Sequence, residues 1–214
     1  MKRVDMDTKS KQNDLNTKGF FVTNILTKNE IKEILDQIKK IFQFDDKNNS
    51  LDEHISLLYK KNPALAGKCY DALNQSATIQ NIFLSKKILK KIAIFHELKT
   101  PSQIAFADFQ FLIMLPSKKK REYLGWHQDS KYFEVSKSKK SSIICWTSIS
   151  SSSNKVNGAL SVMPGSHNLG RIHHIKNSRS KIKKNSSKRK GQFYIDEDKI
   201  NKFKVKNCFI NSGQ

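Results

Sequence analysis

The stretches GWHQD, residues 125–129, and NGALSVMPGSH, residues 157–167, decide how this chain is interpreted. In an extended strand, residues i and i+2 project to the same face, so His127 and Asp129 can turn toward one point at a strand end. An imidazole and a carboxylate that converge are two of the three ligands in the 2-His-1-carboxylate set of non-haem Fe(II) oxygenases. A hydrogen-bonded structural pair has the same pattern, so the surrounding sequence has to decide between the two interpretations.

The sequence after residue 100 predicts strands. Segments 106–115, 142–149 and 159–163 are short, rich in apolar, aromatic or β-branched residues, and separated by turn-forming residues. The sequence before residue 100 has a helical period instead. A strand is expected only at 19–27, GFFVTNILT, where it ends in a turn.

Thr27 and Glu30 have the capping-box spacing that opens a helix, and apolar residues then recur at three- and four-residue steps through 28–42. We expect further helices over 63–80, entered at a proline, and over 81–92, with a polar loop at 43–53. Helices followed by strands predict an all-β core with a helical N-terminal layer.

A chain of 214 residues is long enough for one well-packed domain. We expect a flexible N-terminus over 1–18 and a single domain over 19–214. Within that domain, 19–100 forms the strand and helical layer, 101–214 forms the β core, and the Ser- and Lys-rich stretch 176–190 is an exposed basic loop.

The three cysteines, Cys69, Cys145 and Cys208, form no CxxC pair and suggest neither a disulfide framework nor a zinc ribbon. No apolar segment follows the basic start of the chain, which argues against a secretory signal peptide. The most apolar stretch, 104–115, is too short to cross a bilayer as a helix. The sequence therefore predicts a cytoplasmic protein without a membrane span.

The formal net charge of +21 raises the question of a polyanionic partner. Five of the forty basic residues are Arg, the residue that bidentate phosphate and base recognition favours. We therefore interpret the charge as a solvated Lys-rich surface in preference to nucleic-acid binding, and expect a small-molecule partner. The sequence has no signal for an oligomeric state.

The order of motifs supplies the missing context. HQD, then a Trp-containing strand SIICWTSI, then NGAL-x-V-x-PGSH-x-x-G resembles the phytanoyl-CoA dioxygenase family of Fe(II)/2-oxoglutarate oxygenases, and GFFVTNILTKNEIKEILDQI is similar to that family's opening strand and helix. The resemblance implies a mainly β fold with N-terminal helices. That fold is a double-stranded β-helix, a cupin-like jelly roll, which we expect to be incomplete at the C-terminus.

The resemblance also implies the site. His127 and Asp129 would be iron ligands, with 2-oxoglutarate and O2 as cosubstrates, and His167 would be a structural or rim residue. Trp146 would lie beside the cosubstrate, with plain core packing as an equal alternative. Tyr132 and Phe133 would line the substrate mouth, or simply pack.

The family pattern requires two further residues, a distal His as third ligand and, about ten residues later, an Arg for the far carboxylate of 2-oxoglutarate. The closing residues VKNCFINSGQ resemble the turn that precedes that His, so we expect both residues beyond Gln214. His173 and His174 are the alternative third ligands, although their segment matches a different strand of the family.

For the intact protein, the resemblance implies a dioxygenase that couples the oxidative decarboxylation of 2-oxoglutarate to hydroxylation of a small molecule. The alternative from another class is a catalytically degenerate β-helix protein. Such a protein would bind polyanions or nucleic acid through its Lys-rich loops, 118–121 and 176–190.

Overall fold

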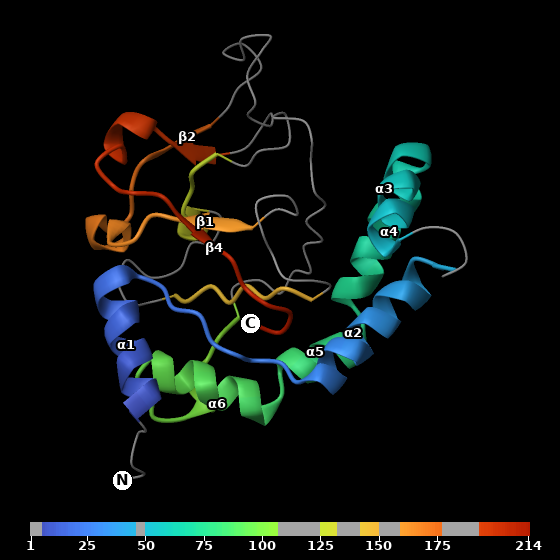
Figure 1. The fold of residues 1–214 in the computed structure, drawn as a ribbon, viewed down its shortest axis with the longest axis horizontal. Coiled ribbons are helices and arrows are strands. Elements are labelled where there is room, and N and C mark those ends of the chain that lie inside the picture. Colours follow the sequence, from blue (N-terminus) through green and yellow to red (C-terminus); the bar gives the residue numbers. More distant parts are fainter. Residues whose placement is uncertain (1–5, 46–49, 107–124, 132–141, 150–158, 177–192) are drawn as a thin grey trace. The chain divides into compact units, whose positions relative to one another are not determined.

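A computed structural model describes residues 6–45, 50–106, 125–131, 142–149, 159–176 and 193–214 (Figure 1). The chain divides into two compact units, which are described separately. The helical unit is drawn from Thr23–Leu115, Thr147–Asn154 and Phe209–Gln214, and the site unit from Met1–Val22, Pro116–Trp146 and Lys155–Cys208.

The helical unit begins with five α-helices in succession. They are α2 (Lys28–Ile41), α3 (Leu51–Lys61), α4 (Pro63–Asn74), α5 (Ala77–Phe83) and α6 (Lys86–Phe95), followed by the 3-10 helix η1 (Pro101–Gln103). A polar residue before each α-helix accepts a hydrogen bond from the backbone N–H three residues on, which satisfies a donor that the helix itself leaves free. These caps set where the helices start.

The core of the helical unit is formed by apolar side chains from these helices. Ile34 of α2, Leu73 of α4 and Ile79 of α5 have no solvent exposure. Helix α2 contacts α4 and α5, and α3 contacts α4, so the apolar stripe predicted for 28–42 faces neighbouring helices. The helix predicted at 28–42 is confirmed, and so is its capping box at Thr27 and Glu30.

The residues 209–214 also belong to the helical unit, where they lie between two segments distant in sequence. The carbonyl of Gly213 accepts hydrogen bonds from the N–H groups of Ile25 and Leu26, at 2.9 and 3.1 Å. The N–H of Gly213 donates to the carbonyl of Ser148 at 2.7 Å. Gly213 therefore ties 25–26 to 147–149 through its backbone.

The site unit contains helix α1 (Met6–Lys18) and two small antiparallel sheets. Strand β1 (Leu160–Val162) pairs with β4 (Lys206–Cys208), and β2 (His174–Lys176) pairs with β3 (Phe193–Ile195). Three 3-10 helices complete it: η3 (Asp129–Lys131), η4 (Ser166–Leu169) and η6 (Glu197–Lys199). Residues 6–18, expected to be flexible, form α1, which has no buried residue.

The prediction of a mainly β fold is wrong for the residues that the structure describes. They are 53% helical and 8% strand, and their four strands form two-stranded sheets and no jelly roll or barrel. The segments 19–27 and 142–149 form neither a helix nor a ladder in the described part, so their β-branched composition alone does not make strands. The predicted strand at 159–163 is present as β1, whereas residues 107–115 lie outside the described ranges.

The segment 43–53 also differs from its prediction as a polar loop. Helix α3 begins within it, after Ser50, whose side chain forms a capping box with Glu53. The expected helix at 63–80 is divided into α4 and α5, because the chain turns at Gln75 and Ser76 opens a new helix. None of the described helices is long and apolar enough to cross a membrane.

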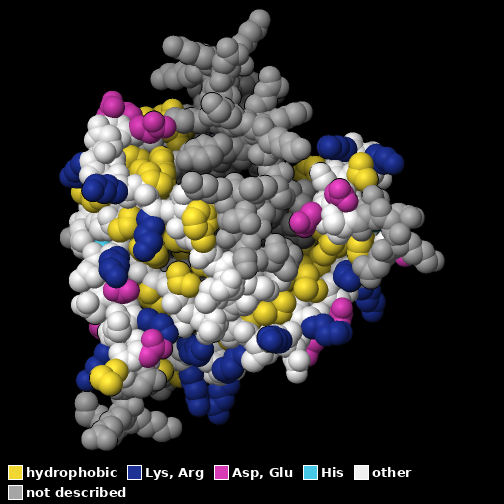
Figure 2. All heavy atoms as spheres, in the orientation of Figure 1, with side chains coloured by type: hydrophobic (Ala, Val, Ile, Leu, Met, Phe, Trp, Pro, Cys, Tyr) yellow, Lys and Arg dark blue, Asp and Glu magenta, His cyan; other side chains and the backbone are white. Residues whose placement is uncertain are grey.

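Lys and Arg side chains are interspersed with acidic and apolar ones on the face of the molecule that Figure 2 shows. Of the two Lys-rich loops, 118–121 lies wholly outside the described residues, and so does 176–190 apart from Lys176. The prediction of a basic loop at 176–190 is therefore untested by the structure, and so is polyanion binding through it.

Candidate metal centre

His127 and Asp129 face each other in the site unit. The His127 Nε2 and Asp129 Oδ1 atoms are 3.2 Å apart, and both side chains are partly exposed. Asp129 opens the 3-10 helix η3, whose first turn is closed by a hydrogen bond from the Lys131 N–H to the Gln128 carbonyl at 3.0 Å. The pair therefore converges because the chain turns directly after His127, and not because both residues belong to one strand.

The spacing of the two atoms fits two adjacent positions around one metal ion. Two ligands at right angles, each about 2.1 Å from a first-row metal, are about 3 Å from one another. The other ring nitrogen of His127, Nδ1, lies 2.8 Å from the carbonyl of Gly125. Because only a protonated Nδ1 can donate to that carbonyl, the neutral ring keeps its lone pair on Nε2, as a metal ligand requires.

The contact with Asp129 also affects the pKa of His127. Its hydrogen bond with Asp129 raises the pKa of the imidazole, burial acts in the opposite direction, and the Gly125 carbonyl adds to the rise. A proton on Nε2 and a metal ion would occupy the same place between the two side chains. Protons should therefore compete with a metal for the pair.

Gln128, between the two candidate ligands, holds a segment distant in the sequence. Its side-chain amide donates to the carbonyl of Gly170 at 2.8 Å, and its side-chain oxygen accepts from the N–H of Ile172 at 2.8 Å. Its own backbone N–H donates to Nε2 of His174 at 2.9 Å. No local pattern in the sequence indicates these contacts, because the partners lie more than forty residues away.

His174 is the only buried polar or charged residue among those the structure describes, with 5% of its surface exposed. Its Nδ1 lies 2.7 Å from the carbonyl of Ile172, so the ring is held at both nitrogens. Burial lowers the pKa of this imidazole, and the nearby charge of His127 lowers it further. Both nitrogens already have partners, which argues against the alternative that His174 is the third ligand.

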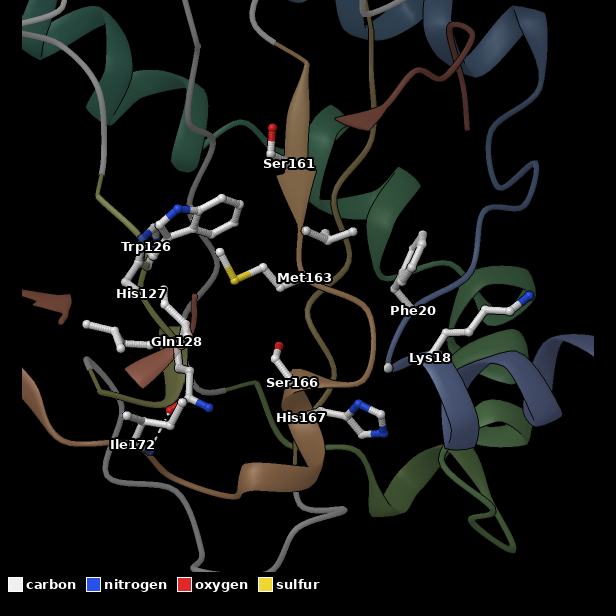
Figure 3. Close-up of a pocket in the computed structure, with 14 residues that line it drawn as sticks. Lys18, Phe20, Trp126, His127, Gln128, Ser161, Met163, Ser166, His167 and Ile172 are labelled. Atoms are coloured by element: carbon white, nitrogen blue, oxygen red, sulfur yellow. Dashed lines mark hydrogen bonds between the residues drawn. The ribbon is translucent and has the colours of Figure 1, made fainter. Parts of the chain in front are cut away.

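A pocket of about 210 Å³ opens beside His127 (Figure 3). Its lining is largely apolar, and polar atoms come from a few side chains that include His127, Gln128 and Ser166. The lining residues come from three parts of the site unit: Lys18, Gly19 and Phe20; Trp126, His127 and Gln128; and Ser161, Val162, Met163, Ser166, His167, Ile172, Ile195 and Ile200. A small organic molecule in this pocket would lie against His127.

The PGSH turn forms one wall of the pocket and is docked on the end of α1. The N–H of Gly165 donates to the carbonyl of Lys18 at 2.9 Å, and Nε2 of His167 lies 3.1 Å from the carbonyl of Asn16. Gly19 has a φ of +83°, and a Cβ there would collide with the His167 imidazole. His167 thus has a structural contact with α1, and Figure 3 shows its ring directed toward that helix.

The sequence profile of the family described as phytanoyl-CoA dioxygenase (PhyH) matches residues 16–202. The chain belongs to the phytanoyl-CoA dioxygenase family. Comparison with curated proteins and with solved structures gives no match. The match confirms the family that the HQD and PGSH motifs predicted, and this family is one of 2-oxoglutarate-dependent dioxygenases.

The phytanoyl-CoA dioxygenase pattern also predicts residues that contact the cosubstrate and the substrate, and none of those that the structure describes lines the pocket. Trp146 is half-buried in the segment 142–149 and does not line the pocket beside His127. Tyr132 and Phe133, predicted to line the substrate mouth, lie outside the described residues. Within the described ranges, no third His, Cys, Asp or Glu joins the pair in a metal-binding group.

Proposed function

We propose that this member of the phytanoyl-CoA dioxygenase family is an Fe(II)/2-oxoglutarate-dependent dioxygenase that hydroxylates a small molecule, with His127 and Asp129 as iron ligands. The observation that supports the proposal is the 3.2 Å spacing of His127 Nε2 and Asp129 Oδ1, with Nδ1 of the same ring held by the Gly125 carbonyl. A structural ion pair needs no fixed tautomer, whereas a ligand pair does.

Bound Fe(II) with 2-oxoglutarate and O2 would supply the oxidising chemistry, since the family couples decarboxylation of 2-oxoglutarate to oxidation of a substrate. The protein's own residues supply the geometry. His127 presents the Nε2 lone pair, Asp129 presents a carboxylate oxygen, and the Gly125 carbonyl keeps the imidazole from rotating. The carboxylate also offsets part of the charge of a divalent cation.

The pocket beside His127 supports a small organic substrate. Phe20, Met163 and Ile172 contribute apolar surface to its lining, while Ser166 offers a polar atom. A substrate bound there would be oriented by shape and by few polar contacts, as in most small-molecule sites.

The test is Fe(II)- and 2-oxoglutarate-dependent formation of succinate by the protein expressed from its complete reading frame. We expect succinate formation with the unsubstituted protein, and a loss of at least about a hundredfold in His127→Ala and Asp129→Ala, which is above the range typical of substitutions outside the ligand set. His173→Ala is the matched control, because His173 is exposed, lies in the same site unit and, among the described residues, joins no metal-binding group with the pair. Succinate formation that survives in both ligand variants would contradict the proposal.

A further inference from the structure

The backbone of residues 126–128 forms hydrogen bonds with the paired strands β2 and β3. The carbonyl of Trp126 accepts a hydrogen bond from the N–H of Ile195 at 2.7 Å, and the N–H of Gln128 donates to His174 Nε2 at 2.9 Å. Ile195 and His174 are themselves cross-strand partners in the β2–β3 ladder. One cross-strand pair, His174 and Ile195, therefore forms hydrogen bonds to the backbone on both sides of His127.

The Gln128 side chain adds a second attachment, to the segment just before β2. Its amide nitrogen donates to the Gly170 carbonyl and its oxygen accepts from the Ile172 N–H, both at 2.8 Å. A glutamate at this position would place an oxygen against the Gly170 carbonyl and lose one of the two bonds. The site therefore uses both the donor and the acceptor of the Gln128 amide.

His174 is oriented for its contact with Gln128. Its Nδ1 donates to the Ile172 carbonyl at 2.7 Å, which leaves the Nε2 lone pair directed at the Gln128 N–H. Since the ring is 5% exposed, loss of this acceptor would leave a partly buried backbone N–H without a partner. The backbone would then be free to rotate between the two candidate ligands.

We propose that His174 and Gln128 are positioning residues that fix the peptide between His127 and Asp129 and so aim both ligand atoms at one point. The inference rests on the proposed function, because it assigns a purpose to the pair's geometry. Rotation about the Gln128 backbone would change the distance between His127 Nε2 and Asp129 Oδ1, since His127 precedes Gln128 and Asp129 follows it. Neither positioning residue is proposed to touch the metal.

The test uses the protein expressed from its complete reading frame, with His174→Phe, His174→Gln and Gln128→Ala. Phenylalanine fills the buried space but accepts no hydrogen bond, whereas glutamine can place its oxygen where Nε2 lies and restore the bond to the Gln128 N–H. His173→Phe is the matched control, because it makes the same change at the exposed neighbouring residue.

The first measurement is made without metal. Hydrogen exchange of the Gln128 amide, followed by NMR, should be slow in the unsubstituted protein and in His173→Phe, and at least about tenfold faster in His174→Phe. The second measurement is titration with Co(II) alone, followed by its absorption bands and by tryptophan fluorescence. We expect the affinity for Co(II) to fall by about 10–100-fold in His174→Phe and by a smaller factor in Gln128→Ala. In His174→Gln it should stay close to that of the unsubstituted protein.

The two measurements separate the possible failures. If the unsubstituted protein does not bind Co(II), the proposed metal site fails, while the exchange data still test the backbone contact. Equal Co(II) affinity in folded His174→Phe and the unsubstituted protein would overturn the positioning role. If His174→Gln loses as much affinity as His174→Phe while its Gln128 amide stays protected, His174 acts as a ligand and the inference is wrong. Should His174→Phe fail to fold, an unchanged affinity in Gln128→Ala overturns the inference.

Discussion

The helical unit and the site unit are stabilised by interactions of different range. In the helical unit, capping contacts join residues three apart, and an apolar core packs α2 against α4 and α5. In the site unit, the contacts that hold Gln128, between the two candidate ligands, are polar and join residues 42 to 46 apart. Stability and site geometry are therefore carried by separate sets of residues, and substitutions should affect them separately.

The largest effect on stability should come from the core of the helical unit. Leu73 on α4 has no exposed surface, so Leu73→Ala should lower the free energy of unfolding by about 2–5 kcal/mol, through lost burial and a residual cavity. Leu65→Ala on the same helix is the matched control, because Leu65 is 43% exposed and should change stability by less than about 0.5 kcal/mol. Urea unfolding of both variants measures the difference, and similar losses would contradict the assigned core.

The second effect tests the attachment of residues 209–214 within the helical unit. Gly213 has a φ of +86°, and a Cβ there would lie 2.8 Å from Ile31 Cδ1 and 3.1 Å from the Leu26 carbonyl oxygen. Gly213→Ala should cost about 1–3 kcal/mol, from overpacking and the left-handed backbone. Gly67→Ala on α4 is the control, since a Cβ there meets nothing within 4 Å and should stabilise by about 0.4–1 kcal/mol. Thermal unfolding that ranks the two variants in the opposite order would refute the contact.

The third prediction concerns the wall of the pocket in the site unit. The left-handed backbone alone should cost Gly19→Ala about 1–2 kcal/mol, and displacement of the His167 imidazole should add to that cost. Because the methyl group meets a side chain, His167→Ala should relieve part of the penalty, and the double variant should be more stable than the sum of the single changes predicts. Strict additivity in unfolding experiments would show that the two residues do not touch.

The smallest effect is electrostatic and belongs to the start of α2. Burial tends to raise the pKa of Glu30, but hydrogen bonds from Lys87 and Thr27 outweigh it and the pKa is lowered. The stability that this carboxylate contributes is therefore present above its unfolded pKa and is lost as pH falls through its folded pKa. Glu30→Gln should cost about 0.2–1 kcal/mol at neutral pH. The difference from the unsubstituted protein should vanish in acid, and a constant difference across pH would contradict the ion pair.

Sequence patterns predicted the parts of the molecule that depend on near neighbours. The capping box at Thr27 and Glu30 located α2, and His127 and Asp129 are close enough in sequence to be read as a pair. The start of α3 after Ser50 has the same capping-box spacing, although the polar composition of 43–53 favours a loop. At this position the local capping contact, and not the composition of the segment, decides the structure.

The remaining features depend on distant partners. Segment 142–149 has the composition of a strand, yet whether it joins a sheet depends on a neighbour that its own sequence does not specify. The roles of Gln128 and His174 likewise arise only when the chain brings together residues 46 apart. No periodicity or spacing encodes such a contact, so it had to come from the structure.

The central claim is that His127 and Asp129 together hold Fe(II), and anaerobic Fe(II) titration against a competing chelator tests it most directly. The protein expressed from its complete reading frame should bind about one equivalent. His127→Ala and Asp129→Ala should each weaken binding by more than about tenfold, whereas His173→Ala should not. Binding should also weaken below the raised pKa of His127, because a proton then occupies Nε2. Equal affinity in the three variants would contradict the claim.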